Sequence, residues 1–282
     1  MHDHPIRVAV FDIDGTLAMM DKVTNTYTAL PGAVAALDAC RAAGIATVAY
    51  TNGTFFPPAH YFPRLADVGL NFEPGHVLTP AVVAAHHLAE TGHKRVMTFG
   101  VEGTIVPMTE AGFEVVAPEP GAGRVDAILV GWGRDFNLSQ LEAMAQAVWD
   151  GAMPYVVSDA PYFAGAKGRM LGVSGAIGAM IEQTTGVTAV VLGKPATLGM
   201  DMIEALTGVS GREMVVVGDD PALEPPMARK VGALAIGVTT GLADSHAFLR
   251  ADADIRAHLV MSSLEDFPKQ AWLETSGRQD ND

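Results

Sequence analysis

A short apolar segment that ends in two acidic residues is the feature that most constrains this chain. Residues 8–11 are Val-Ala-Val-Phe, and Asp12, Ile13 and Asp14 follow directly. This pattern predicts a buried strand, and the Gly-Thr pair at 15–16 predicts the turn that leaves it. Side chains alternate along a strand, so Asp12 and Asp14 lie on one side and Ile13 on the other. If the strand is parallel, both carboxylates sit at its carboxyl end, where open α/β sheets bind their ligands.

Two carboxylates at this spacing favour a bound cation. Like charges so close together repel each other unless a cation or a shared proton relieves them. Mg²⁺ is a hard ion that prefers carboxylate and carbonyl oxygens, so the pair predicts a magnesium site. These residues alone also leave open an exposed, solvated acidic turn.

Composition narrows the class of protein. The 282 residues suffice for one large domain or two modest ones, and 49% hydrophobic against 18% charged residues excludes a disordered chain. No apolar stretch is long enough to span a bilayer, and residues 1–5 run directly into the first strand. We therefore expect no membrane segment, no signal peptide and a cytoplasmic location.

Charge and cysteine content add two further expectations. The formal net charge of −14, without any run of Lys or Arg, argues against a nucleic-acid partner. Cys40 is the only cysteine, which excludes an internal disulfide. Its neighbours are typical of a helix, and we expect Cys40 to be a buried, small apolar residue.

Strands and helices alternate along the predicted fold. In the first segment a strand at 7–11, a loop, a helix near 31–43, a strand at 45–50 and a helix near 57–68 are predicted. The middle segment begins near 79–80 and contains strands at 95–99, 125–130 and 154–158 and a helix at 138–149. The closing segment has strands at 190–192, 214–218 and 233–238 and a helix near 197–206. This order predicts a parallel sheet with helices on both faces.

Three further clusters of polar residues follow predicted strands. Thr51 and Asn52 offer a hydroxyl, an amide and backbone N–H groups that suit a phosphate, although an ordinary turn remains open. Lys194 is a point charge able to offset phosphate or a carboxylate pair, or else a solvated surface residue. Asp219 and Asp220 repeat the opening theme of a β-branched strand that ends in acids.

Taken together and in this order, the four clusters resemble a known family. Asp-x-Asp-Gly-Thr at 12–16, Thr-Asn at 51–52, Lys194 and Gly-Asp-Asp at 218–220 are similar to the four motifs of the haloacid dehalogenase superfamily of phosphohydrolases. In that superfamily, more than a hundred residues between the second and third motifs mark a type-two cap domain.

Two middle segments refine the resemblance. Residues 130–137 and 155–159 look like cap segments of the NagD-type, or p-nitrophenyl-phosphatase-like, subfamily with a type IIA cap. The resemblance implies an α/β fold with a Rossmann-like parallel-sheet core and an inserted α/β cap domain. The core would comprise residues 1–79 and 188–282, and the cap residues 80–187.

The resemblance also implies a chemistry, a Mg²⁺-dependent phosphatase acting on a small phosphorylated metabolite. Asp12 would be the nucleophile that forms an aspartyl phosphate, and Asp14 the general acid and base. Lys194 would offset the charge of Asp12 and of the transferring group. Thr51, Asn52 and Gly53 would bind phosphate oxygens.

The metal set and the cap residues follow from the same resemblance. Mg²⁺ would be held by Asp12, the Asp14 backbone carbonyl and Asp219, with Asp220 or Glu224 in support. Glu224 stands where the family usually has Asp. In the cap, the loop after Ser158 and Asp159 is the expected specificity element. Within it, Lys167 or Arg169 would meet a second anionic group of the substrate.

Alternatives remain at this point. A phosphoryl-transferring mutase would use the same carboxylate pair, and a catalytically silent protein that binds a phosphorylated ligand could share the fold. A 2-haloacid dehalogenase needs neither Mg²⁺ nor the second acid of the first motif, so Asp14 speaks against it. The residues do not decide the oligomeric state, and a homodimer formed through the caps is left open by the resemblance.

Overall fold

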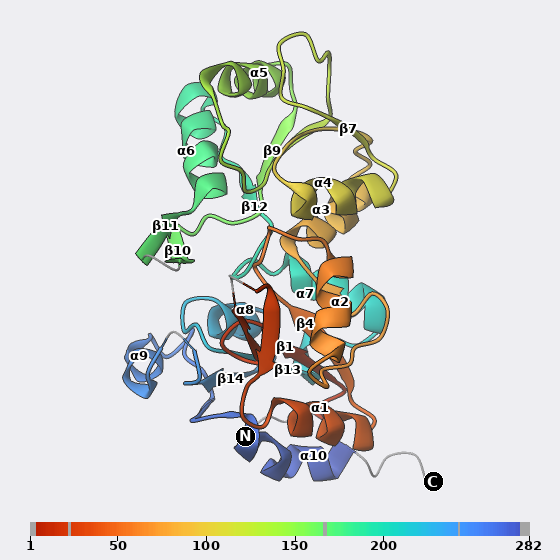
Figure 1. Cartoon of the computed structure of the whole chain (residues 1–282), viewed down its shortest axis with the longest axis vertical. Helices are drawn as coiled ribbons and strands as arrows, with labels where there is room; N and C mark the ends of the chain where they lie inside the picture. Colours follow the sequence, from red (N-terminus) through yellow and green to blue (C-terminus); the bar gives the residue numbers. More distant parts are fainter. Residues whose placement is uncertain (1–3, 22–23, 166–167, 242, 277–282) are drawn as a thin grey trace. The chain divides into compact units, whose positions relative to one another are not determined.

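The computed structural model describes residues 4–21, 24–165, 168–241 and 243–276. Two compact units make up the chain (Figure 1). The first, called the core below, comprises residues 1–51, 60–78 and 200–282, and the second, called the cap, comprises residues 52–59 and 79–199. The cap unit thus includes residues 52–59 and 188–199, for which the sequence predicts membership of the core.

A six-stranded parallel sheet, ordered β15-β14-β13-β1-β4-β5, forms the centre of the core. Its strands are β1 (Val8–Phe11), β4 (Ala46–Tyr50), β5 (Val77–Leu78), β13 (Met214–Gly218), β14 (Leu234–Val238) and β15 (Leu259–Met261). Val10 of β1 pairs with Val216 on one side and with Val48 on the other. Every residue of β1 and β13 is buried, as expected for central parallel strands covered on both faces. The predicted α/β class with a parallel-sheet core is confirmed.

Helices connect the core strands or follow the last of them. They are α1 (Ala33–Ala42), α2 (Pro58–Ala66), α7 (Leu198–Thr207), α8 (Glu224–Lys230), α9 (Ser245–Arg250) and α10 (Ala271–Ser276), with 3₁₀ helices η1 (Gly211–Glu213) and η2 (Leu264–Lys269). Helix α1 begins two residues after the predicted position because Gly32 is left-handed, with φ +82°, and lies against the backbone of η2.

The cap has a parallel sheet of its own, ordered β12-β9-β8-β6-β7. Its strands are β6 (Arg95–Phe99), β7 (Glu114–Val116), β8 (Ala127–Val130), β9 (Met153–Val156) and β12 (Val190–Val191). Its helices are α3 (Pro80–Glu90), α4 (Glu102–Glu110), α5 (Leu138–Trp149) and α6 (Val173–Thr185).

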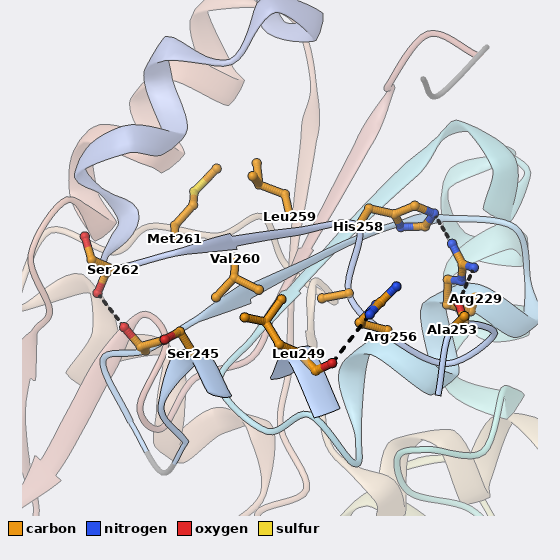
Figure 2. A pocket seen from close by; sticks show the side chains of 12 residues that line it. Arg229, Ser245, Leu249, Ala253, Arg256, His258, Leu259, Val260, Met261 and Ser262 are labelled. Carbon is orange, nitrogen blue, oxygen red and sulfur yellow. Dashed lines mark hydrogen bonds between the residues drawn. The ribbon is translucent and has the colours of Figure 1, made fainter. Parts of the chain in front are cut away.

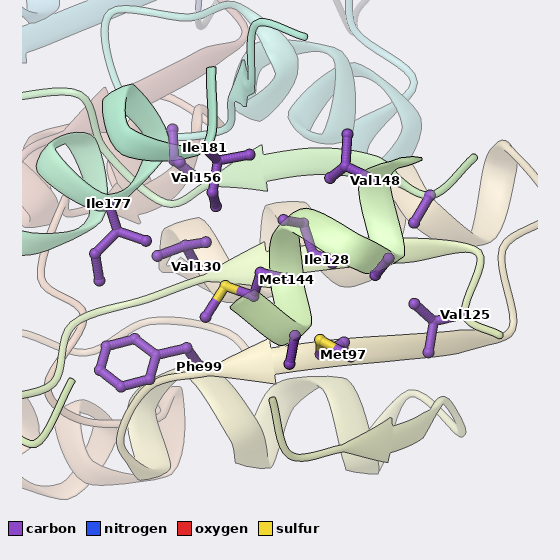
Figure 3. Packing of buried hydrophobic residues seen from close by; sticks show 13 residues of the cluster. Met97, Phe99, Val125, Ile128, Val130, Met144, Val148, Val156, Ile177 and Ile181 are labelled. Atoms are coloured by element: carbon purple, nitrogen blue, oxygen red, sulfur yellow. The ribbon is translucent and has the colours of Figure 1, made fainter. Parts of the chain in front are cut away.

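Alternate residues of the cap strands belong to two separate clusters of buried side chains, one on each face of the sheet. Ile128 and Val130 of β8 pack with Met144 of α5 and Ile177 of α6, as Figure 3 shows. Leu129, between them in the chain, belongs to the opposite cluster with residues of α3 and α4. Burial on both faces explains why these strands read as continuous apolar runs.

Two antiparallel hairpins lie outside the sheets. In the core, β2 (Ala18–Asp21) pairs with β3 (Thr26–Ala29), and in the cap, β10 (Tyr162–Gly165) pairs with β11 (Gly168–Leu171). The prediction of a plain loop between the first strand and the first helix is therefore wrong. Neither strand of the core hairpin is a long β-branched run, so the pairing of the two creates an element that neither predicts alone.

Within the described ranges, no helix combines the length and the apolar character that crossing a membrane requires.

Candidate active site

The two acidic clusters of the core lie at the ends of neighbouring strands. Asp12 follows β1 and its backbone N–H donates to the Val217 carbonyl of β13 at 2.9 Å. Asp219 comes directly after β13. Both carboxylate residues are buried, with 8% of Asp12 and 3% of Asp219 exposed. Adjacent parallel strands thus bring together two acids that are more than two hundred residues apart in the sequence.

Glycines allow the Asp219 carboxylate to approach the first acidic turn. Gly15 has φ +91°, and a Cβ at Gly15 or at Gly241 would overlap with the carboxylate of Asp219. The carboxylate therefore lies against the backbone that follows Asp14. The Thr240 hydroxyl fastens this turn by donating to the Gly15 carbonyl at 2.6 Å.

Asp14 itself is exposed and sits where the β2–β3 hairpin begins. It forms an isolated bridge with Ala18, and the Gly15 N–H donates to the Ala18 carbonyl at 3.0 Å. Thr51 follows β4 at the same carboxyl edge of the sheet, is buried, and donates its N–H to the Leu78 carbonyl at 3.1 Å. The core edge thus collects Asp12, Asp14, Thr51 and Asp219.

Asp220 and Glu224 hydrogen-bond within their own loop. The Glu224 side chain, 2% exposed, accepts from the Asp220 N–H at 3.3 Å, and a Cβ on Gly218 would overlap with it. Asp220 accepts from the Ala222 N–H at 2.8 Å. In the part of the chain that the structure describes, no three His, Cys, Asp or Glu side chains form a group able to hold a metal.

Asn52 and Lys194 are joined by a reciprocal pair of hydrogen bonds inside the cap unit. The Asn52 side-chain oxygen accepts from the Lys194 N–H, and its NH₂ group donates to the Lys194 carbonyl, both at 2.9 Å. A Cβ on Gly193 would collide with the Asn52 side chain. Lys194 is 2% exposed, which excludes the solvated surface residue that the sequence leaves open. The Asn52 amide is thus engaged in fixing the segment that carries the lysine.

The predicted cap residues have local roles in the structure. The Ser158 hydroxyl accepts from the Ala160 N–H at 3.2 Å, and the Ser158 carbonyl accepts from the Ser174 hydroxyl at 2.7 Å. Asp159 is exposed. Arg169 lies in β11, opposite Ala164 of β10. Lys167 lies outside the described residues.

An aromatic cluster in the cap unit is absent from the predicted set. The Phe55 ring lies 4.3 Å from the Trp132 ring and 5.9 Å from the Phe163 ring, measured between centroids. Phe55 comes two residues after Gly53, so the same short segment carries predicted phosphate-binding groups and an aromatic surface. The two consecutive phenylalanines at 55–56, directly after Gly53 and Thr54, are the sequence feature that could have indicated this cluster.

Two tyrosines beside the acids were also missed. Tyr27 of β3 and Tyr61 of α2 are buried, with ring centroids 6.5 Å apart. Burial raises the pKa of the Tyr27 hydroxyl, and the charges of Asp14 and Asp12 raise it further. Burial and the same two charges also raise the pKa of Tyr61. Both phenols therefore stay protonated at neutral pH.

A cavity in the core lies away from these residues. It has a volume of about 870 Å³ and is lined by residues of α8, α9, β15 and the loops beside them (Figure 2). Arg229 donates to the Ala253 and Asp254 carbonyls at 2.9 and 3.1 Å, and Arg256 donates to the Leu249 carbonyl at 3.4 Å. None of the residues that line this cavity is a predicted site residue, and both of its arginines donate hydrogen bonds to backbone carbonyls.

Family models match the chain on either side of its middle segment. A model described as haloacid dehalogenase-like hydrolase matches residues 9–114, which include the first two motifs. A second, described as HAD-hydrolase-like, matches residues 191–267, which include the third and fourth. This chain belongs to the haloacid dehalogenase-like hydrolases. The predicted family is confirmed.

Known phosphatases resemble the chain over most of its length. The acid sugar phosphatase of Staphylococcus aureus is 26% identical over 236 residues, which are 83% of this chain and 86% of that protein. The 4-nitrophenylphosphatase of Thermotoga maritima has a TM-score of 0.82 at 23% identity, with 94% of this chain and 97% of that chain covered.

A third similar protein is the glycerol phosphate phosphatase of Mycobacterium tuberculosis, crystallised in complex with magnesium. Its TM-score is 0.79 at 24% identity, with 93% of this chain and 76% of that chain covered. These structures share the fold of a core with a cap, in agreement with the NagD-type, p-nitrophenyl-phosphatase-like subfamily.

Proposed function

We propose that this hydrolase is a Mg²⁺-dependent phosphatase that cleaves a small phosphomonoester through an aspartyl phosphate on Asp12. One observation carries the proposal. The buried carboxylates of Asp12 and Asp219 end adjacent strands, and the Asp219 carboxylate lies against the turn that contains Asp14. The three similar proteins described above are named as phosphatases, which supports the same reaction.

The donor groups at this edge fit Mg²⁺. The ion keeps several waters and is usually held by one or two carboxylates together with substrate phosphate, so it needs no cage of three acidic side chains. The side chains of Asp12 and Asp219 and the backbone carbonyl of Asp14 would hold it. When bound, the ion would offset the negative charge of the phosphoryl group. Asp220 and Glu224 would support this set by shaping the loop after β13.

The residues of the chain divide the chemistry between them. An Asp12 oxygen attacks phosphorus while the bond from phosphorus to the leaving-group oxygen breaks, and Asp14 gives that oxygen a proton. Asp14 then takes a proton from a water molecule whose oxygen attacks phosphorus, which releases inorganic phosphate and restores Asp12. Each step conserves protons, because Asp14 recovers in the second step the proton it gave in the first.

Phosphate binding is assigned to groups at the ends of β4 and β12. Thr51 and the backbone N–H groups of Asn52 and Gly53 would bind phosphate oxygens, and Lys194 would offset their charge. The hydrogen bonds between Asn52 and Lys194 support the joint placement of these two residues. Asn52 therefore has a positioning role through its side chain and a binding role through its backbone.

The substrate proposed is a phosphorylated metabolite that carries hydroxyl groups. The acid sugar phosphatase and the glycerol phosphate phosphatase among the similar proteins support a sugar or polyol phosphate. Ser158, Asp159 and Arg169 in the cap would contribute to its selection. Ser158 and Asp159 act through the turn they build, since the Ser158 hydroxyl already serves Ala160.

The test is the loss of turnover in Asp12→Asn. Purified protein with Mg²⁺ is expected to hydrolyse p-nitrophenyl phosphate, and the variant should lose at least about a thousandfold in kcat because an amide cannot form the phosphorylated intermediate. Released phosphate is measured, and the wild-type intermediate is trapped by rapid acid quenching and located by mass spectrometry.

Asp38→Asn is the matched control. Asp38 is an exposed acid on α1, paired with Arg41 at 2.6 Å, and its loss should leave turnover unchanged. Retained turnover in Asp12→Asn, or an intermediate located on another residue, would contradict the proposal.

A further inference from the structure

A buried hydroxyl without a protein partner lies beside the acidic turn of the core. Tyr27 is 5% exposed, and its hydroxyl makes no hydrogen bond with any residue that the structure describes. Buried polar groups are satisfied in the great majority of cases, so such a group indicates strain or a role toward a ligand. Three threonine hydroxyls share this condition, at Thr16, Thr79 and Thr104. Only Tyr27 combines it with a long side chain that senses the charges of Asp14 and Asp12.

The β2–β3 hairpin holds Tyr27 in this place. Its first strand begins at the bridge between Asp14 and Ala18, and the Leu30 N–H donates to the Leu17 carbonyl at 2.9 Å where the hairpin closes. Tyr27 pairs with Met20 and is the one residue of β3 that is buried. Hairpin and acidic turn are thus one connected piece of backbone, with the tyrosine on its inner face.

Neighbouring groups fix the ring from the other side. The Tyr61 ring of α2 lies 6.5 Å from the Tyr27 ring, and Arg64 of the same helix donates to the Asn25 carbonyl at 3.3 Å. The ring contact and the hydrogen bond to Asn25, two residues before Tyr27, hold this tyrosine in place, and neither of them engages its hydroxyl. Its raised pKa keeps it a neutral donor near two carboxylates.

We propose that Tyr27 is a specificity-determining residue whose hydroxyl binds a hydroxyl oxygen on the leaving group of a polyol phosphate. This inference rests on the proposed function. Asp14, as the acid, must lie beside the leaving-group oxygen, and Tyr27 carries a buried hydroxyl without a protein partner on the hairpin that begins at the Asp14–Ala18 bridge. A phenol both donates and accepts, which matches an alcohol group, whereas backbone N–H groups and Lys194 would bind the phosphate oxygens. A site built to pair with a substrate hydroxyl discriminates against substrates that lack one.

The experiment compares Tyr27→Phe with the wild type on two substrates in the presence of Mg²⁺. For glycerol phosphate, kcat/KM should fall about tenfold, the size of one lost hydrogen bond. For p-nitrophenyl phosphate, whose leaving group carries no alcohol, it should change by less than about twofold. The midpoint of thermal unfolding should not fall, because the change removes a buried hydroxyl that has no partner in the fold.

Tyr155→Phe serves as the matched control. Tyr155 is a buried tyrosine of the cap sheet, and its substitution should leave the ratio of the two kcat/KM values unchanged. An equal fall on both substrates, no change on either, or a lowered unfolding midpoint in Tyr27→Phe would each overturn the inference. Failure of the proposed function has a different signature, which is the absence of phosphate release from both substrates by the wild type.

Discussion

At the scale of single residues, the site depends on glycines as much as on acids. Gly15 adopts φ +91° and leaves the space that the Asp219 carboxylate occupies. A side chain there would meet two penalties at once, the left-handed backbone and the overlap with a buried carboxylate. The Gly after Asp-x-Asp is thus required by both the turn and the acid that arrives from β13.

Gly15→Ala should therefore lower the free energy of unfolding by about 3 kcal/mol and weaken Mg²⁺ binding. Gly44→Ala is the matched control, because Gly44 has φ +68° with open space where a Cβ would stand. It should cost only about 1 kcal/mol of backbone strain. Urea unfolding and calorimetric titration with Mg²⁺ measure the two effects, and equal costs at the two glycines would contradict this account.

The sequence predicted which acidic residues lie at the same edge of the sheet, but not the different contacts that each of them makes. Asp12, Asp14 and Asp219 follow from their positions after strands. The sequence leaves Asp220 and Glu224 as equal supporting ligands, and the structure places each carboxylate on a backbone N–H of the loop. Such a division depends on side-chain reach and on the absence of a Cβ at Gly218, which spacing does not encode.

At the scale of elements, α1 follows from its sequence pattern. Its buried residues, Ala33, Ala36, Leu37 and Cys40, have the spacing of one helical face. The prediction that Cys40 is a buried, small apolar residue is confirmed, since it is buried as a free thiol. Burial raises the pKa of the thiol from 9.0 to about 12.

The thiol of Cys40 should therefore resist modification in the folded protein. At pH 8 only about one thiol in ten thousand would be ionised at this pKa, and the thiolate is the reactive form. Ellman's reagent should label the native protein negligibly and react at once in 6 M guanidinium. Rapid stoichiometric labelling without denaturant would show that α1 does not cover its face as described.

The β2–β3 hairpin is an element that the sequence pattern does not predict. Each strand is four residues long and half exposed, so neither carries an apolar period strong enough to identify it. The hairpin forms because its strands pair with each other and connect to the Asp14 turn. It brings to the acids a tyrosine that the linear motifs do not contain.

At the scale of the whole molecule, the inserted cap has a hydrophobic core of its own. Met144 is fully buried between α5 and the cap sheet (Figure 3). Met144→Ala should cost about 2–5 kcal/mol in the cap, whereas Leu138→Ala on the same helix, 68% exposed, should stay within about 0.5 kcal/mol.

Hydrogen exchange followed by mass spectrometry locates the effect of this change. Amides of β6, β8 and β9 should lose protection in Met144→Ala, while those of β1, β4 and β13 should keep theirs, because the two sheets are buried in separate clusters. A uniform loss of protection in both sheets would contradict two independent cores.

The sequence by itself determined the family, the parallel core and the principal acids, because these depend on local patterns, namely apolar strands followed by charged turns. Tertiary structure decided what depends on contacts between distant segments. It joined Asn52 to Lys194, placed the Asp219 carboxylate in the space beside Gly15, and assigned Glu224 to a backbone N–H. It also turned a predicted loop into the hairpin that carries Tyr27 to the acidic turn. Pairing and close approach are properties of two segments together, and neither segment specifies them alone.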